Sequence, residues 1–289
     1  MKIFFQQIRV HQWAKNILVF VPFITAHKFL EFSSFLHILL AFLAFNFCAS
    51  GLYLLNDILD LEADRNHLEK KNRPLASGKF PLWLAISILP FFLLISFGIA
   101  WKLPKEFIYF LLTYAGVNSC YSYIFKKIVL LDVITLASLY TLRILAGASA
   151  IMVPVSEWLL VFSMFLFLSL ALAKRAIELK LLENEPDPKI KGRGYITHDL
   201  EYISSMGIAS GFISALVLAL YVNSPHVRTL YRKPELLWFI CPILLYWIGR
   251  VWLLTRRGII HSDPVVSALK DKATYVIGIC LSILMYLAI

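Results

Sequence analysis

The chain has 289 residues, of which 60% are hydrophobic and 16% are charged, and its mean hydropathy is +0.74. Soluble domains are about half apolar and about a quarter charged, so this composition excludes a soluble globular protein and indicates an integral membrane protein. The formal net charge of +10 does not indicate nucleic-acid binding, because no soluble basic domain is present to carry it.

Apolar segments follow one another along nearly the whole chain. A transmembrane helix needs about 20 mostly apolar residues, and fewer when it is buried within a bundle. We therefore predict an all-α fold, a polytopic membrane helical bundle of about nine transmembrane helices that forms a single domain over residues 1–289. The predicted helices are roughly 15–31, 34–56, 80–101, 105–125, 128–150, 156–180, 202–223, 234–254 and 269–289.

The polar segments predict an orientation. Residues 1–15 mix aromatic and basic side chains, which is typical of an interfacial segment. Lys and Arg concentrate there, in the loops 57–80 and 181–201, and at other segment ends on the same side. The positive-inside rule then places the N-terminus and both loops in the cytoplasm, in an inner (cytoplasmic) membrane. The loops follow the second and sixth predicted helices, which indicates two related halves.

The four cysteines lie singly in apolar segments, at positions 48, 120, 241 and 280. This spacing favours plain buried thiols over a zinc site or a disulfide framework.

An acidic run ends the second predicted helix. On one helix Asp57, Asp60 and Asp64 would stand at i, i+3 and i+7, so all three carboxylates would share a face. Three acids on one face repel one another and require a counter-ion. Mg²⁺ binds one or two carboxylates together with substrate phosphates, so we predict a Mg²⁺-bridged diphosphate at the membrane surface. The alternative is a solvated charged loop, which leaves the spacing unexplained.

Cations follow these acids, with glycine and proline shaping the loop. We expect Arg65, Lys71 and Arg73 to contact phosphate oxygens. A second charged cluster, Lys174, Arg175 and Glu178, lies in an otherwise apolar helix. Ionisable groups there are functional candidates. Lys174 or Arg175 would hold a phosphate while Glu178 orients the cation or shares a metal; the alternative is a simple i, i+4 ion pair between Lys174 and Glu178.

Several other polar residues are weaker candidates. Tyr123 and Lys127 are spaced i, i+4 beside the expected anion site, although aromatic and lysine pairs are also ordinary at an interface. Trp13, Lys15 and Asn16 are candidates to meet a lipid headgroup. Asp132 and Arg143 are either structural partners of other helices or direct participants, and His198 and Asp199 fit a solvated loop.

These residues resemble the motifs of the UbiA superfamily of intramembrane prenyltransferases. The resemblance rests on Asn56-Asp57-x-x-Asp60-x-x-x-Asp64, on the run Asn72-Arg73-Pro74-Leu75-Ala76-Ser77-Gly78, and on the nine-segment layout. It implies a UbiA-like fold and a diphosphate donor bound through Mg²⁺, with transfer to an acceptor. Family members usually carry a second DxxxD run, which is here replaced by Lys174-Arg175-x-x-Glu178.

That departure is similar to one branch, the decaprenyl-phosphate phosphoribosyltransferases. The likeness extends to Gln12-Trp13-Ala14-Lys15-Asn16, to Tyr123-x-x-x-Lys127, and to Asp263-Pro264 with Leu269-Lys270-Asp271-Lys272. It implies phosphoribosyl pyrophosphate as donor and a polyprenyl phosphate as acceptor. The donor's additional 5-phosphate favours a second site that is richer in cations. The predicted substrate-binding residues are Asn56, Arg65, Lys71, Arg73, Tyr123, Lys127, Lys174, Arg175, Glu178, Lys15 and Gln12.

Two rival functions make different predictions. A prenyltransferase with an aromatic or other small acceptor would share the metal site but consume a prenyl diphosphate. A transporter would place charges near mid-membrane with broken helices, whereas here the ionisable residues gather at helix ends. The oligomeric state is open, and a homo-oligomer is compatible with the sequence.

Overall fold

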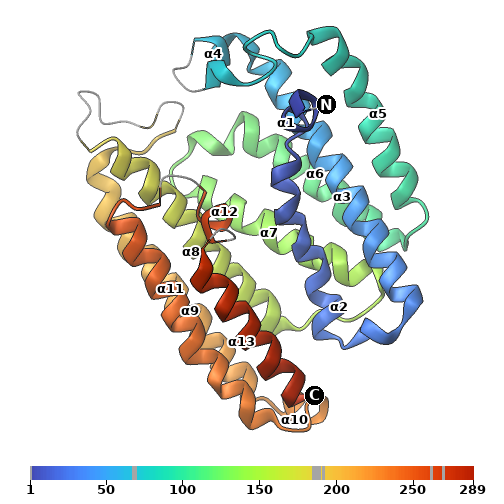
Figure 1. Cartoon of the computed structure of the whole chain (residues 1–289), viewed down its shortest axis with the longest axis vertical. Coiled ribbons are helices and arrows are strands. Elements are labelled where there is room, and N and C mark those ends of the chain that lie inside the picture. The colour runs from blue at the N-terminus through green and yellow to red at the C-terminus, as the bar shows by residue number, and fades with distance from the viewer. Residues whose placement is uncertain (1, 67–69, 184–189, 191–192, 261–262, 269–270) are drawn as a thin grey trace. The chain divides into compact units, whose positions relative to one another are not determined.

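The computed structural model describes residues 2–66, 70–183, 190, 193–260, 263–268 and 271–289, and every regular element within these ranges is a helix (Figure 1). The contacts divide the chain into two compact units. Unit 1 comprises Met1–Tyr123 and Leu142–Val155, and unit 2 comprises Ile124–Thr141 and Ser156–Ile289. Helix α7 (Leu131–Ala150) supplies residues to both.

Unit 1 is built on the long apolar helix α3, which packs against α5. Its elements, besides the second part of α7, are α1 (Lys2–Gln7), η1 (Val10–Phe20), α2 (Val21–Thr25), η2 (Lys28–Leu30), α3 (Phe32–Leu59), α4 (Leu61–Arg65), η3 (Lys70–Asn72), α5 (Leu82–Ala100) and α6 (Lys105–Tyr123). A core of Ile8, Leu54, Leu75, Phe80, Ala85 and Phe92 joins the turn after α1, α3, α5 and the loop after η3. This core fixes the loop that carries Arg73.

Unit 2 is built on the paired helices α8 and α9, with α11 against them. Its elements, besides the first part of α7, are η4 (Phe125–Lys127), α8 (Glu157–Leu181), η5 (Thr197–Asp199), α9 (Leu200–Val222), α10 (Pro225–Leu230), η6 (Pro234–Phe239), α11 (Ile240–Arg256), α12 (Pro264–Ala268) and α13 (Lys272–Ala288). Gly207 permits the close approach of α11, because a Cβ there would stand 2.1 Å from the Trp252 ring. The Trp252 indole N–H donates to Ser169 Oγ at 2.9 Å.

Six helices in the described part of the chain have the length and apolarity to cross a membrane, and α13 is a shorter apolar helix. The six are Phe32–Leu59, Leu82–Ala100, Leu131–Ala150, Glu157–Leu181, Thr197–Val222 and Pro234–Arg256. The predicted all-α multi-pass class is therefore confirmed, whereas the count of about nine is not.

The first predicted helix, 15–31, is wrong as a continuous α-helix. The chain runs instead through the eleven-residue 3₁₀ segment η1 and the short helices α2 and η2. Pro22 at the start of α2 lacks an N–H and cannot continue the preceding hydrogen-bond pattern, and His27 turns the backbone at φ 55°. Tight packing accompanies this geometry, since a Cβ on Gly147 of α7 would stand 2.0 Å from the Val19 carbonyl oxygen.

Candidate functional site

The acidic run of unit 1 spans a helix break. Helix α3 ends at Leu59, Asp60 adopts φ −90° and ψ 9°, and α4 begins at Leu61. The prediction of three aspartates on one uninterrupted helix face is therefore wrong. Asp57 and Asp64 are 3% and 2% exposed, whereas Asp60 is half-buried at the break. The two outer carboxylates point into unit 1.

Arginines neutralise these two buried carboxylates. Arg73 Nη1 lies 3.2 Å from Asp57 Oδ1 and 2.5 Å from Asp64 Oδ2, so one nitrogen bridges both acids. Arg9 Nη2 lies 2.5 Å from the same Asp57 Oδ1. Burying a charge without a partner is costly, and two guanidiniums against two carboxylates leave the cluster neutral. The counter-ion that the sequence demands is, in this arrangement, a pair of arginines.

Gln7 stabilises this cluster of Asp57, Asp64, Arg9 and Arg73 through two buried hydrogen bonds. Its Nε2 donates to Asp57 Oδ2 at 2.9 Å, and its Oε1 accepts from the Leu75 N–H at 3.0 Å. Gln7 is only 1% exposed, so this buried amide ties α1, α3 and the loop after η3 together. Three glutamines precede Trp13 in the sequence, namely Gln6, Gln7 and Gln12, and Gln12 is the one that the resemblance predicts. The glutamine that contacts the acidic run is Gln7.

Arg9 has an unusual backbone. It lies between α1 and η1 in the left-handed region, with φ 54° and ψ 47°, and its guanidinium carbon stands 4.9 Å over the Tyr53 ring. A non-glycine residue in this region costs about 1 kcal/mol or more. The turn aims the side chain at Asp57.

A cavity of about 310 Å³ opens beside these groups. It is lined by Gln6, Arg9, His11, Asp57, Asn72, Arg73 and Pro74. The side chains of Arg9 and Arg73 are 22% and 31% exposed, so both guanidiniums are accessible while the acids they bind are not. Guanidinium groups recognise phosphate through charge-assisted hydrogen bonds, and this lining suits an anion.

The remaining predicted residues of unit 1 lie in varied surroundings. Asn56 Nδ2 donates to Ser122 Oγ at 2.9 Å and thereby joins α3 to α6. Arg65 and Lys71 are exposed, and Gln12 and Lys15 are half-buried. Tyr123 is exposed and ends α6, and Lys127 is exposed in η4, so their i, i+4 spacing does not fall on one α-helix. The prediction of a helical pair is wrong there.

The suggestion that Asn16 meets a lipid headgroup is also wrong, because its side chain is buried at 1% exposure. Its Nδ2 donates to Asn46 Oδ1 at 2.7 Å, and its Oδ1 accepts from Arg143 Nε at 2.7 Å. Arg143 also donates to the Tyr114 hydroxyl at 3.0 Å. Of the two roles left open for Arg143, these contacts favour the structural one.

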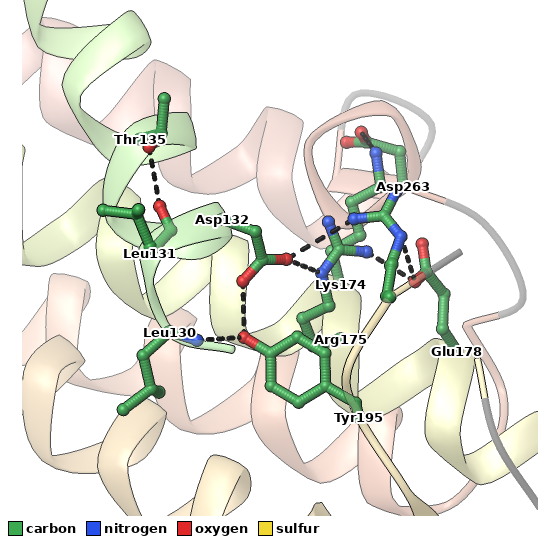
Figure 2. Close-up of polar contacts among 10 residues, drawn as sticks. Leu130, Leu131, Asp132, Thr135, Lys174, Arg175, Glu178, Tyr195 and Asp263 are labelled. Atoms are coloured by element: carbon green, nitrogen blue, oxygen red, sulfur yellow. Dashed lines mark hydrogen bonds and ion pairs between the residues drawn. The ribbon is translucent and has the colours of Figure 1, made fainter. Parts of the chain in front are cut away.

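Unit 2 holds the second charged cluster, which is centred on Asp132 (Figure 2). Asp132 Oδ2 accepts from Arg175 Nε at 2.6 Å and from Arg193 Nη1 at 3.4 Å, and Oδ1 accepts from the Tyr195 hydroxyl at 2.5 Å. The Tyr195 oxygen in turn accepts from the Leu130 N–H at 2.9 Å. The side chains of Asp132 and Arg175 are both 0% exposed. Burial, together with the hydrogen bond to Asp132, raises the pKa of Tyr195.

Glu178 and Lys174, two partly exposed members of this cluster, do not pair with each other. Glu178 contacts Arg175 Nη1 and lies 3.8 Å from Arg193 Nε, while Lys174 Nζ lies 3.2 Å from Asp263 Oδ2. The alternative of a simple Lys174–Glu178 ion pair is therefore not what the structure shows, because Lys174 pairs with Asp263 and Glu178 pairs with Arg175. Lys270 and Leu269, which entered the resemblance, lie outside the described residues.

Sequence reasoning missed Gln7, Arg9, Arg193 and Tyr195. Each lies outside the acidic and basic runs used for the prediction. Each contacts a carboxylate that lies 48 residues or more away along the chain. Arg193 also has a contact closer in sequence, with Glu178. A local signal existed only for Arg193, which stands between two glycines in a polar loop.

Comparison with known proteins places this chain in a family and matches its fold. The model of the UbiA prenyltransferase family matches residues 18–263. The chain belongs to the UbiA prenyltransferase family. A solved UbiA homolog from Archaeoglobus fulgidus, bound to DMAPP and Mg²⁺, shares the fold with a TM-score of 0.72 and 16% identity over 98% of this chain and 96% of that one. The predicted membership and UbiA-like fold are confirmed.

Three relatives of this UbiA-family chain differ in what is known of them. The uncharacterized protein y4nM of Sinorhizobium fredii is 36% identical over 94% of this chain, which spans only 53% of that relative's length. The nodulation protein NoeC of Azorhizobium caulinodans is 32% identical over 96% of this chain and 92% of its own. The decaprenyl-phosphate phosphoribosyltransferase of Mycolicibacterium smegmatis is 34% identical, over 93% and 87% respectively. The comparisons thus show a member of the UbiA prenyltransferase family and leave its donor open.

Proposed function

We propose that this chain transfers the 5-phosphoribosyl group of phosphoribosyl pyrophosphate to a polyprenyl phosphate and releases pyrophosphate. The likeness to the Mycolicibacterium smegmatis enzyme over nearly the whole chain supports this reaction. In the reaction a phosphate oxygen of the lipid forms a bond to C1 of the ribose, and the bond from C1 to the pyrophosphate oxygen breaks. The acceptor is already ionised, so the chain need not supply a strong base.

One observation carries the choice of donor, namely that the second cluster pairs its acids with cations. Asp132, Glu178 and Asp263 each have an arginine or lysine partner. A prenyl diphosphate has one anionic end, whereas phosphoribosyl pyrophosphate has a second phosphate. The partly exposed Lys174 and Arg193 suit that group.

The acidic run of unit 1 fits Mg²⁺. Its donors are hard carboxylate oxygens, and one Arg73 nitrogen lies within reach of both Asp57 and Asp64, so their oxygens are close together. Mg²⁺ needs only one or two protein carboxylates beside phosphate and water oxygens. Asp57, Asp60 and Asp64 would hold the ion, which would neutralise charge developing on the leaving pyrophosphate.

The chain's own residues would bind and orient the substrates. Arg73 lines the cavity of unit 1 and would contact phosphate oxygens there. Arg175 is wholly buried, so we assign it a positioning role, in which it holds Asp132 and Glu178. Holding reactants in one geometry accounts for much of the rate in such a transfer. The other proposed substrate contacts remain Asn56, Arg65, Lys71, Tyr123, Lys127, Lys174, Glu178, Lys15 and Gln12.

The membrane supplies the acceptor's surroundings. Apolar helices of the chain would accommodate the polyprenyl tail, while only the headgroup reaches polar side chains. We propose that the enzyme lies in the inner membrane with its N-terminus and active site in the cytoplasm, where the basic segments gather.

A second candidate is prenyl transfer. The Archaeoglobus fulgidus homolog is bound to DMAPP and Mg²⁺, and this favours a prenyl diphosphate as a donor for a chain with the same fold. Both candidates use a diphosphate leaving group, so the acidic run does not separate them. The donor must be identified directly.

The deciding experiment incubates the purified chain with Mg²⁺, phosphoribosyl pyrophosphate and a polyprenyl phosphate, and seeks the phosphoribosylated lipid by mass spectrometry. We expect that product, and none when a prenyl diphosphate and an aromatic acceptor are supplied. Prenylated product without phosphoribosylated lipid would overturn the proposal in favour of the second candidate. Chelation of Mg²⁺ should abolish turnover.

A further inference from the structure

The acids that should bind Mg²⁺ are already engaged by arginines. Asp57 Oδ1 contacts both Arg9 Nη2 and Arg73 Nη1, and Asp64 Oδ2 contacts Arg73 Nη1. A cation that binds these oxygens must displace guanidinium nitrogens from them. Mg²⁺ and the two arginines therefore compete for the same pair of carboxylates.

Charge balance decides which ligands can enter. Two guanidiniums and two carboxylates are neutral together. Mg²⁺ alone would leave two arginines beside a metal, with no anion to receive them. Pyrophosphate alone would compete with the buried carboxylates for the same arginines. When both enter, the carboxylates take the metal and the arginines take the phosphate oxygens, so every charge keeps a partner.

We propose that Arg73 and Arg9 are exchangeable counter-ions that make Mg²⁺ binding and diphosphate binding depend on each other. Without ligand they neutralise Asp57 and Asp64, and on loading they move to the diphosphate. The inference rests on the proposed function only through the diphosphate, which phosphoribosyl and prenyl donors share.

The surroundings of the two arginines suit this exchange. Both side chains are partly exposed and line the same cavity of about 310 Å³, together with His11 and Asn72. Gln7 behaves differently, because it is 1% exposed and binds the other oxygen of Asp57, Oδ2. Asp57 is therefore held on one oxygen by a fixed amide while its second oxygen faces the exchangeable arginines.

The exchange can be tested without turnover, by titration calorimetry on the purified full chain in detergent. The three arms are Mg²⁺ alone, inorganic pyrophosphate in chelator, and inorganic pyrophosphate at saturating free Mg²⁺, corrected for complex formation in solution. We expect weak binding in the first two arms and at least about tenfold tighter pyrophosphate binding in the third, as is usual for coupled sites. Pyrophosphate binding that is equally tight with and without Mg²⁺ would overturn the proposal.

The variant Arg73→Gln should change two affinities in opposite directions. The variant removes the cation that bridges Asp57 and Asp64, so Mg²⁺ alone should bind about tenfold more tightly than in the wild type. Pyrophosphate with Mg²⁺ should bind more weakly, since a phosphate ligand is lost. A purely structural arginine would weaken both. Lys79→Gln, which removes an exposed cation from the same loop, should change neither.

Arg9→Gln covers the case in which Arg73→Gln fails to fold. It leaves the bridge from Arg73 to both acids in place, so the fold keeps that ion pair. As with Arg73→Gln, we expect Mg²⁺ alone to bind more tightly and pyrophosphate with Mg²⁺ to bind more weakly, but with smaller changes in both affinities. Parallel losses of both affinities, or no change, in a folded Arg9→Gln protein would contradict the exchange. If Mg²⁺ and pyrophosphate binding depend on each other as proposed but no phosphoribosyl transfer is found, only the proposed donor would be refuted.

Discussion

The two charged clusters of this chain are built from the same residue types but differ in what is buried. In unit 1 the carboxylates of Asp57 and Asp64 are inside while Arg9 and Arg73 reach an open cavity. In unit 2 Asp132 and Arg175 contact each other (Figure 2), and both side chains are 0% exposed. An accessible cation can leave its carboxylate for a ligand, whereas a wholly buried pair cannot part without leaving a bare charge. The first cluster is therefore suited to exchanging its arginines for a ligand, and the buried pair of the second cluster is suited to stabilising the fold.

The largest effect on stability should come from the buried pair. Asp132→Asn removes the carboxylate that faces Arg175, Arg193 and Tyr195. The buried Arg175 then keeps only Glu178 as an acidic partner, so we expect a loss that approaches the roughly 3–5 kcal/mol of a broken buried ion pair. Thermal unfolding in detergent should show this loss, and Glu201→Gln, an exposed acid on α9, should not. The double variant Asp132→Leu with Arg175→Met should recover part of the stability. Equal stability of wild type and Asp132→Asn would contradict the supporting role.

The largest effect on activity should come from the acid pair. Asp64→Asn keeps the shape of the side chain but removes one of the carboxylates expected to bind Mg²⁺, so we expect turnover to fall by about a hundredfold or more, the scale of a lost electrostatic contact to the reacting group. Glu62→Gln is the matched control, because this acid is exposed on the same helix α4. Rates measured with saturating Mg²⁺ check the prediction. Full activity in Asp64→Asn would refute the metal assignment.

The two nearby glutamines offer a smaller test. Gln7→Leu leaves the buried Asp57 Oδ2 and the Leu75 N–H without their partner, at about 1–3 kcal/mol. Gln12→Leu changes a half-buried residue and should cost less than half as much. Unfolding midpoints of the two variants give the comparison. If Gln12→Leu were the more damaging variant, the support of the acidic run would have to be assigned again.

The smallest effect is a dependence on pH. The raised pKa of Tyr195 means that the folded chain binds its proton more tightly than the unfolded chain does. This contribution to stability is therefore complete below the ordinary tyrosine pKa of about 10 and is lost as pH rises above it. Unfolding midpoints between pH 9 and 11 should fall less steeply in Tyr195→Phe than in the wild type. Parallel curves would show that Asp132 does not hold the proton on Tyr195.

Much of this molecule follows from local sequence. Eight of the nine predicted helices return among the described residues with ends shifted by only a few residues, and 234–254 begins as the 3₁₀ segment η6. A long apolar run in a membrane has no alternative to a helix that satisfies its own backbone. The predicted 15–31 helix failed where Pro22 and the left-handed His27 interrupt the pattern. The acidic run was also found from spacing alone, although its helix breaks at Asp60.

The sequence by itself determined the membrane class, most helices, the family and the acids Asp57 and Asp64, since hydropathy and residue spacing are properties of neighbouring residues. Only the tertiary structure decided which cation faces which acid. Arg9 meets Asp57 across 48 residues, and Tyr195 meets Asp132 across 63. The physical reason is that a carboxylate removed from water binds whichever donors the packing of distant helices brings beside it, and no local spacing records that choice.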